Sequence, residues 1–126
     1  MNATNVALSL TVGGLFAAGC YLLLQRALLR VILGFLLLGH GANLLLLLGG
    51  GPAGNPPVTG DTAQADAADP LPQAMALTAI VITFGVTTLL LALAHRSVSL
   101  HGDDNVQDDV EDRAVAGRTL QPDEET

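Results

Sequence analysis

The long apolar stretch over residues 28–48 limits what this chain can fold into more than any other part of the sequence. As an α-helix, its 21 residues span roughly 31 Å, about the thickness of the hydrocarbon core of a bilayer. Its one formal charge, Arg30, stands near one end, and most of the remaining residues are leucines. A segment of this length with so little charge predicts a helix that crosses a membrane.

Two further segments, residues 6–24 and 74–94, also lack any charged side chain. Half of the chain is hydrophobic but only 3% is aromatic, and the apolar residues come in blocks rather than in the periodic pattern of a soluble core. The first block follows no basic residue and is longer than the core of a signal peptide, so we interpret it as a retained helix. The sequence therefore predicts an all-α integral membrane protein with three transmembrane helices, over about residues 6–24, 28–48 and 71–95.

Residues 49–70 have the composition of an exposed loop between the second and third helices. They hold four prolines and several glycines, and such a chain buries too little apolar area to fold alone. Asp69 and Pro70, at the end of the loop, suit the N-cap and the first position of the third helix. We expect residues 1–96 to form the membrane domain.

The arginines near the expected spans indicate the orientation. Arg26, Arg30 and Arg96 all fall on one side of a three-span chain, whereas the 49–70 loop has no arginine. Cytoplasmic segments of membrane proteins carry the excess of basic residues. We therefore expect a multi-pass protein of the cell membrane, with the N-terminus and the loop outside and the C-terminus in the cytoplasm.

The segment 97–126 holds nine of the 12 acidic residues, and we expect a disordered acidic cytoplasmic tail. Its run DDNVQDDVED lacks the central glycine and the ligand spacing of a calcium loop. The chain has no lysine and no basic patch for nucleic acid. Its single cysteine, Cys20, excludes an intrachain disulfide and a cysteine metal cluster. We predict no metal site, no cofactor and no catalytic residue.

Small residues in the predicted helices indicate close helix packing. Gly14 and Ala18 are four residues apart and lie on one face of the first helix, while Gly34 and Gly85 lie in the second and third. Small side chains let another helix approach closely in a membrane. We expect these positions to pack against other helices rather than to form a chemical site.

Polar residues within the apolar spans are the candidates for function. His40 and Asn43 are three positions apart and share a helical face, and His40 can change its charge near neutral pH. His40 either borders a hydrated ion path at a subunit interface or serves as a neutral, hydrogen-bonded residue that holds helices together. Thr78 and Thr83 either line the same path or bond to their own helix.

Two stretches, GCYLLLQRALLRVILGFLLLGHGANLLLL and DPLPQAMALTAIVITFG, resemble the C subunit of the Mrp-type (Mnh) multisubunit sodium/proton antiporters. That family is in turn similar to the K subunit of respiratory complex I, NuoK. The resemblance runs from about residue 6 to residue 96. It implies a three-helix protein inside a seven-subunit complex, beside the large antiporter-like A and D subunits and small subunits that include F and G. It also implies exchange of external H⁺ for internal Na⁺.

The chain departs from the NuoK-type pattern at two positions. NuoK-type proteins carry a glutamate in each of their last two helices, and the resemblance places Leu36 and Thr83 at those positions here. A carboxylate relay through this subunit is therefore absent. Without a buried acid, the chain is not expected to act as an antiporter, or as a proton-coupled multidrug carrier, by itself.

These observations lead to one main interpretation and two alternatives. We expect a subunit of a Na⁺/H⁺ antiporter that is required for assembly and contributes to the ion path. The first alternative is a K-type subunit of a complex I-like oxidoreductase, which the missing glutamates and the HGxN and DPLPQ motifs disfavour. The second is a purely structural assembly subunit, which the sequence does not separate from the main interpretation.

Overall fold

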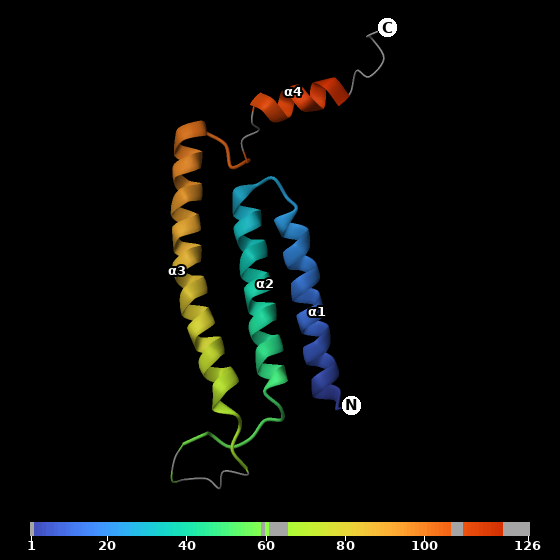
Figure 1. The fold of residues 1–126 in the computed structure, drawn as a ribbon, viewed down its shortest axis with the longest axis vertical. Helices are drawn as coiled ribbons and strands as arrows, with labels where there is room; N and C mark the ends of the chain where they lie inside the picture. The colour runs from blue at the N-terminus through green and yellow to red at the C-terminus, as the bar shows by residue number, and fades with distance from the viewer. Residues whose placement is uncertain (1, 59, 61–65, 107–109, 120–126) are drawn as a thin grey trace.

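The computed structural model describes residues 2–58, 60, 66–106 and 110–119. These residues form four helices: α1 (Ala3–Leu23), α2 (Leu28–Gly49), α3 (Pro70–His101) and α4 (Val110–Thr119) (Figure 1). By length and composition, α1, α2 and α3 are each able to cross a membrane. The all-helical architecture with three candidate spans is confirmed, because each of the three long helices covers most or all of one predicted span.

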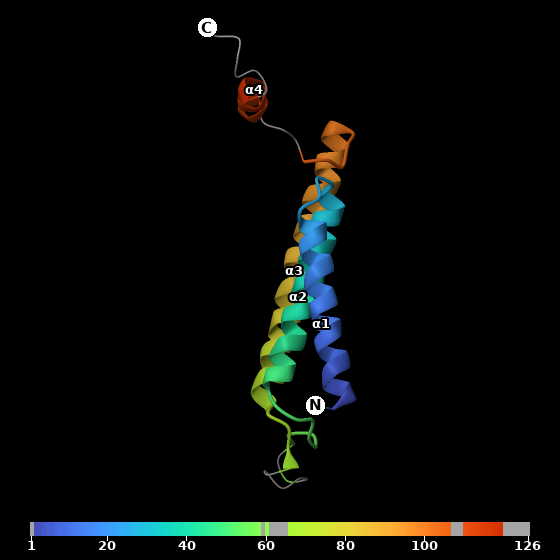
Figure 2. The same cartoon turned by 90° about the vertical axis from the view of Figure 1, so that its right-hand side faces the viewer.

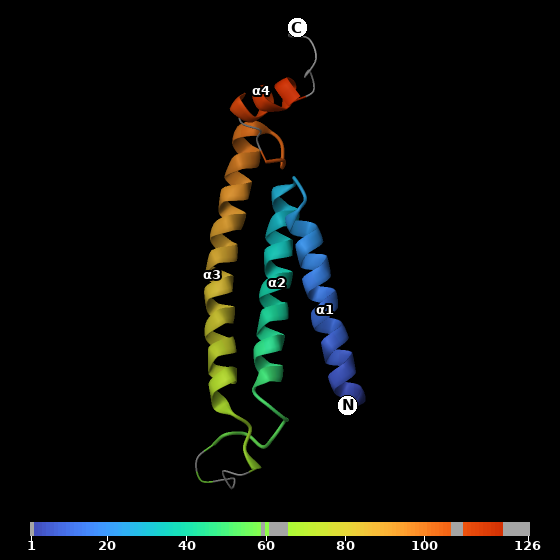
Figure 3. The same cartoon turned by 45° about the vertical axis from the view of Figure 1, so that its right-hand side comes forward.

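The three long helices lie side by side in one layer with α2 in the middle (Figure 1). In the described residues α1 and α3 each contact α2, and they do not contact each other. Turned edge-on, the three helices overlap as a thin layer (Figure 2). The N-terminus and the α2–α3 connection lie at one end, and α4 lies beyond the other (Figure 3). The layer therefore leaves two broad apolar faces without cover from the described part of the chain.

Glycines hold α1 and α2 together. A Cβ added at Gly34 would lie 2.7 Å from the carbonyl oxygen of Gly19 and 2.8 Å from the amide nitrogen of Leu23. A Cβ added at Gly19 would lie 2.8 Å from Cγ of Leu38. Both glycines are buried, so the two backbones touch at a point where no side chain fits.

The third helix begins where the sequence predicts and ends later. The carboxylate of Asp69 accepts a hydrogen bond of 3.0 Å from the amide of Leu71, and Pro70 occupies the first turn. The sequence predicts an end at residue 95, but α3 continues to His101 because no residue between them breaks a helix. Gly102 stops it with a φ of 72°, a left-handed conformation that suits glycine.

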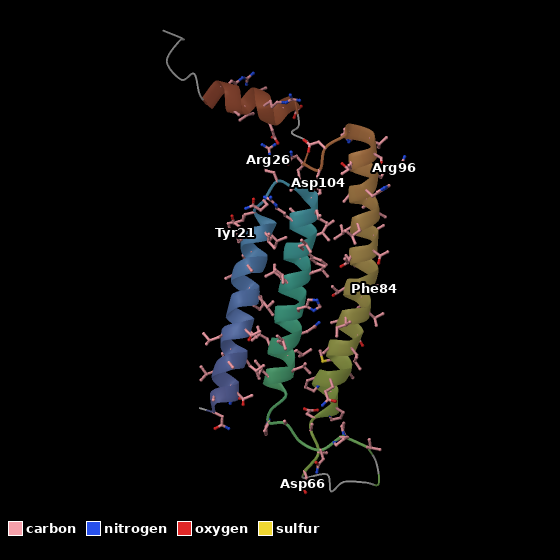
Figure 4. All side chains as sticks on the ribbon, turned by 180° about the vertical axis from the view of Figure 1, so that it is seen from behind. Tyr21, Arg26, Asp66, Phe84, Arg96 and Asp104 are labelled. Atoms are coloured by element: carbon pink, nitrogen blue, oxygen red, sulfur yellow. The ribbon has the colours of Figure 1, made fainter. Side chains whose placement is uncertain are left out.

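Residues 103–106, which we name the C-terminal strap, connect α3 to the turn between α1 and α2. The amide of Leu28 donates to the carbonyl of Asp104 at 2.8 Å, and the amide of Val106 donates to the carbonyl of Arg26 at 2.9 Å. Arg26 and Asp104 lie together at this end of the layer (Figure 4). The strap thus ties the end of α3 to the α1–α2 turn, although the helices α1 and α3 are separated by α2.

The described parts of the α2–α3 connection also pair with each other. The amide of Asn55 donates to the carbonyl of Asp66 at 2.8 Å, and the amide of Ala68 donates to the carbonyl of Asn55 at 3.0 Å. A Cβ at Gly54 would lie 2.7 Å from the nitrogen of Ala68, so this crossing also needs a glycine. The predicted loop therefore has local order close to the helix ends.

The segment expected to be a disordered tail is helical in part. Residues 97–101 continue α3, and residues 110–119 form α4. Glu111 and Asp112 in the first turn of α4 and Arg118 in its last turn suit the helix dipole. Residues 107–109 of the acidic run, and residues 120–126, lie outside the described residues.

The contact between Gly19 and Gly34 leads to a stability prediction. We expect Gly34→Ala to destabilise the chain by about 1–3 kcal/mol, because the new methyl group meets backbone atoms that cannot rotate away. Thermal unfolding of the purified chain in a mild detergent measures this change. Gly49→Ala is the matched control in the same helix, since a Cβ there has nothing within 4 Å. Equal melting temperatures for the two variants would contradict the predicted close contact.

The strap leads to a prediction on pH. Hydrogen bonds from the side chain of Asn105, and next from its backbone amide, hold the pKa of Asp103 below its ordinary value of 3.8. The ionised carboxylate therefore stabilises the strap above that value, and its contribution is lost as pH falls through the lowered pKa. The NMR shift of the Asn105 amide, followed during acid titration, measures this transition.

In that titration, the Asp112→Asn variant serves as the control and is expected to titrate like the parent chain. Asp103→Asn is expected to abolish the transition at Asn105. A midpoint at or above the ordinary value would show that the hydrogen bonds to Asp103 do not form in solution.

Candidate functional site

The contact between α2 and α3 brings the first candidate residue into position. A Cβ at Gly39 would lie 3.7 Å from Cγ2 and 3.9 Å from Oγ1 of Thr83, which is ordinary van der Waals distance. The Thr83 hydroxyl is half-buried and donates to the carbonyl of Ala79 at 2.7 Å. Thr83 therefore faces α2 at the residue next to His40.

His40 and Asn43 lie on α2 close to this contact. The His40 side chain is exposed and Asn43 is half-buried. Within the described residues, the chain supplies no side-chain hydrogen bond to either of them. Neither bonds to the other, so both polar groups are available to a neighbouring protein or to water.

Thr78 lies apart from these residues. It is exposed on α3, and its hydroxyl donates to the carbonyl of Ala74 at 3.0 Å. Five positions separate it from Thr83, which is roughly 140° around the helix. The structure therefore places Thr83 against Gly39, the residue before His40 in the sequence, and leaves Thr78 on a different face of α3.

The four residues predicted to pack helices differ in their surroundings. Gly34 lies against α1, as described above. A Cβ at Gly14 or Gly85 has nothing within 4 Å, and Ala18 is exposed. Whatever packs against these last three positions must come from outside the described part of the chain. Phe84, which lies on α3 (Figure 4), is similarly uncovered, with 74% of its surface exposed.

A cavity of about 360 Å³ lies at the end of the layer near the N-terminus, and nothing in the sequence pattern predicts it. It opens between the first turns of α1 and α3 and the last turns of α2. Its polar lining residues are Thr4, Asn5, Asp69 and Gln73. Asp69 stands out in the sequence only as the N-cap of α3, and that role gives no indication of a cavity.

The chemistry available within the membrane is limited to neutral hydrogen-bonding groups and one imidazole near the middle of the layer. The sequences of α1, α2 and α3 contain no Asp or Glu. In the described residues, no group of three or more His, Cys, Asp or Glu side chains is arranged to hold a metal ion. Such a set can bind water or orient a partner's ionisable group, and it offers no acid of its own for proton exchange.

The fold and these residues define a small, three-helix membrane subunit with polar groups turned towards its surroundings. The sequence profile of NADH-ubiquinone/plastoquinone oxidoreductase chain 4L matches residues 7–111, and the chain belongs to that family. This finding confirms the NuoK-like resemblance.

Two relatives of known role are similar to this chain over most of its length. The chain is 50% identical over 103 residues to the C subunit of the Na⁺/H⁺ antiporter of Alkalihalophilus pseudofirmus, and the match covers 81% of this chain and 91% of the relative. It is 46% identical over 102 residues to the C subunit of the Na⁺/H⁺ antiporter of Bacillus subtilis, covering 79% and 89%. The predicted resemblance to the antiporter C subunits is confirmed.

Two solved structures have the same fold. A chain in the Mrp complex from Dietzia sp. matches with a TM-score of 0.73 and 38% identity, covering 95% of this chain and 97% of that chain. A chain in the membrane-bound sulfane sulfur reductase, an archaeal respiratory membrane complex, matches with a TM-score of 0.72 and 28% identity, covering 86% and 98%. The three-helix layer therefore occurs in both an Mrp complex and a respiratory complex.

Proposed function

We propose that this chain is the C subunit of a multisubunit Na⁺/H⁺ antiporter of the Mrp type. The observation that carries the proposal is the 50% identity to an antiporter C subunit over 81% of this chain and 91% of that relative. The similarity of its fold to a chain in an Mrp complex supports the same assignment. The relatives are subunits of a transport complex, so the chain is a transport subunit and not an enzyme.

The structure explains why such a subunit needs partners. A layer one helix thick cannot bury its own apolar side chains, and large residues on all three helices are exposed. The three spans contain no acidic residue, so proton exchange has to use groups of other subunits. We propose that the antiporter-like A and D subunits, the small subunits including F and G, and lipid cover these faces.

Within the complex, we propose that His40, Asn43 and Thr83 border the ion path where another subunit meets α2 and α3. The exposed imidazole of His40 and the amide of Asn43 lack hydrogen-bond partners within the described chain. Na⁺ and H⁺ are the transported ions, and no cofactor takes part. Thr78, on a different face of α3, is proposed to contact a second subunit. Gly14, Ala18 and Gly85 are proposed to pack against helices of other subunits.

The alternative of a K-type subunit in a respiratory complex also has support. The family profile is named for an oxidoreductase chain, and the archaeal respiratory complex contains the same fold. Sequence identity favours the antiporter, with 38% to the chain in the Mrp complex against 28% to the chain in the respiratory complex. A purely structural role within the antiporter is the remaining alternative, and a variant of His40 distinguishes it.

The first test compares Na⁺/H⁺ antiport in everted membrane vesicles that carry the whole complex, with parent or His40→Ala chain. We expect His40→Ala to lower antiport about a hundredfold and to shift its pH profile, because a positioned general acid–base group contributes about 10²–10⁴-fold. Pull-down of the complex and blotting for its other subunits measures assembly in the same vesicles.

His95→Ala is the matched control, since His95 is also exposed but lies near the end of α3. We expect it to leave antiport unchanged. If antiport in His40→Ala falls only in proportion to the amount of assembled complex, His40 has a structural role and no place in the ion path.

The second test concerns orientation, for which we propose an external N-terminus and α2–α3 connection and a cytoplasmic C-terminus. In a Cys20→Ala background, we introduce Val58→Cys in the connection or Ala116→Cys in α4, both at exposed positions. A membrane-impermeant maleimide applied to intact cells is expected to label position 58 and to label position 116 only after permeabilisation. The reverse pattern would contradict the distribution of arginines that motivates the orientation.

A further inference from the structure

Four threonines lie along the middle of α3, and one of them differs from the others. The hydroxyls of Thr78, Thr83 and Thr88 donate to the carbonyl four residues earlier, at 3.0, 2.7 and 2.8 Å. This bond to the preceding turn is the usual arrangement of threonine in a helix. The Oγ1 of Thr87 is buried and, within the described residues, has no hydrogen-bond partner. Each buried polar atom without a partner requires a physical explanation, because its burial is unfavourable.

The position of Thr87 shows what encloses it. Thr87 lies one turn after Thr83 and shares its face of the helix, which is the face that meets α2 at Gly39. Because α2 and α3 run in opposite directions, this register places Phe35, four residues before Gly39, level with Thr87. Phe35 and the adjacent Leu36 offer no polar atom in their side chains. The hydroxyl is therefore enclosed between α3 and an apolar part of α2.

The two helix contacts of the layer differ in how tightly they are built. Between α1 and α2, backbone atoms meet at Gly19 and Gly34. A Cβ added at either glycine would lie 2.8 Å or less from an atom of the other helix. Between α2 and α3, the glycine at the contact, Gly39, leaves ordinary distances of 3.7 and 3.9 Å to Thr83. Around Gly39 the α2–α3 contact is consequently looser than the α1–α2 contact at Gly34, whereas at the start of α3 a Cβ added at Gly50 would lie 2.8 Å from Cγ of Pro72.

From these observations we infer that Thr87 is a positioning residue of the ion path, whose hydroxyl takes up a water molecule when α2 and α3 separate. The inference rests on the proposed function, and it adds a residue and a moving contact to it. The enclosed hydroxyl disfavours the closed contact, and hydration of the hydroxyl favours the separated one. In the separated state, Thr87 extends the line of polar groups from Thr83 towards the end of the layer where the C-terminal strap lies.

The test uses the whole complex in everted vesicles, with this chain as parent, Thr87→Val, Thr87→Ser or Thr88→Val. Valine has the shape of threonine without the hydroxyl, and serine keeps the hydroxyl. Thr88→Val is the matched control because Thr88 is the neighbouring threonine, is exposed and bonds to its own helix. Antiport is measured over a range of pH and Na⁺ concentration, and the amount of assembled complex is measured by pull-down in every preparation.

We expect Thr87→Val to assemble at least as well as the parent, because it removes an unpartnered buried hydroxyl. We also expect it to lower antiport per assembled complex about fivefold and to change the pH profile or the apparent KM for Na⁺, as the loss of one hydrogen bond to a path water predicts. Thr87→Ser keeps the hydroxyl and is expected to retain the activity of the parent. Thr88→Val is also expected to match the parent.

Two results overturn the inference. One is a Thr87→Val complex with the antiport, pH profile and apparent KM of the parent, which would show that the hydroxyl takes no part in transport. The other is a loss of activity that follows a loss of assembled complex, which would make Thr87 a packing residue. A parent complex without Na⁺/H⁺ antiport would instead refute the proposed function itself, and the two failures are therefore distinguishable.

Discussion

The close contact between Gly19 and Gly34 is the interaction on which the arrangement of this chain depends. In a membrane, lipid tails are as apolar as the side chains of the helices, so helices associate through close packing rather than through the hydrophobic effect. Two buried glycines let the backbones of α1 and α2 touch, and this fixes the angle and the register of the pair. The third helix packs on the other side of α2.

This arrangement accounts for the way the subunit presents its polar residues. A compact bundle would turn His40 and Asn43 inwards, where they would need partners within the chain. The chain instead forms a layer with α2 at its centre (Figure 1). In this layer His40 is exposed and Asn43 is half-buried. A subunit that carries no acid in its spans can still act beside ionisable groups of other subunits, provided that its polar side chains face them.

The main elements are predictable from the sequence because their signals are strong and local. Twenty-residue apolar blocks and the capping pair Asp69–Pro70 specify three helices regardless of what surrounds them. The predicted end of α3 is six residues too early (95 instead of 101), because the change from apolar to polar residues near His95 marks the end of the apolar block and not of the helix. The strap is not predictable in this way, since it depends on backbone pairing between segments far apart in the sequence.

The site is less predictable because it, too, depends on contacts between segments that are far apart in the sequence. Sequence alone shows that Gly14 and Gly34 are both small, but only the packing shows that Gly34 meets α1 whereas Gly14 meets nothing in the described chain. The threonines of α3 are equivalent by composition, and only their surroundings distinguish Thr87 from Thr88. The polar residues His40 and Asn43 stand out in the sequence, but what their side chains contact is decided by other subunits.

The pairing of α1 with α2 also has a consequence for how the protein is made. All contacts of this hairpin join segments that leave the ribosome together, whereas α3 follows after the long connection. Contacts between segments close in sequence form early, because little chain entropy is lost in bringing them together. The hairpin can therefore form in the bilayer as a unit during synthesis, and α3 then docks on a surface that is already complete. The strap, which is synthesised after all three spans, closes the finished layer at the turn of the hairpin.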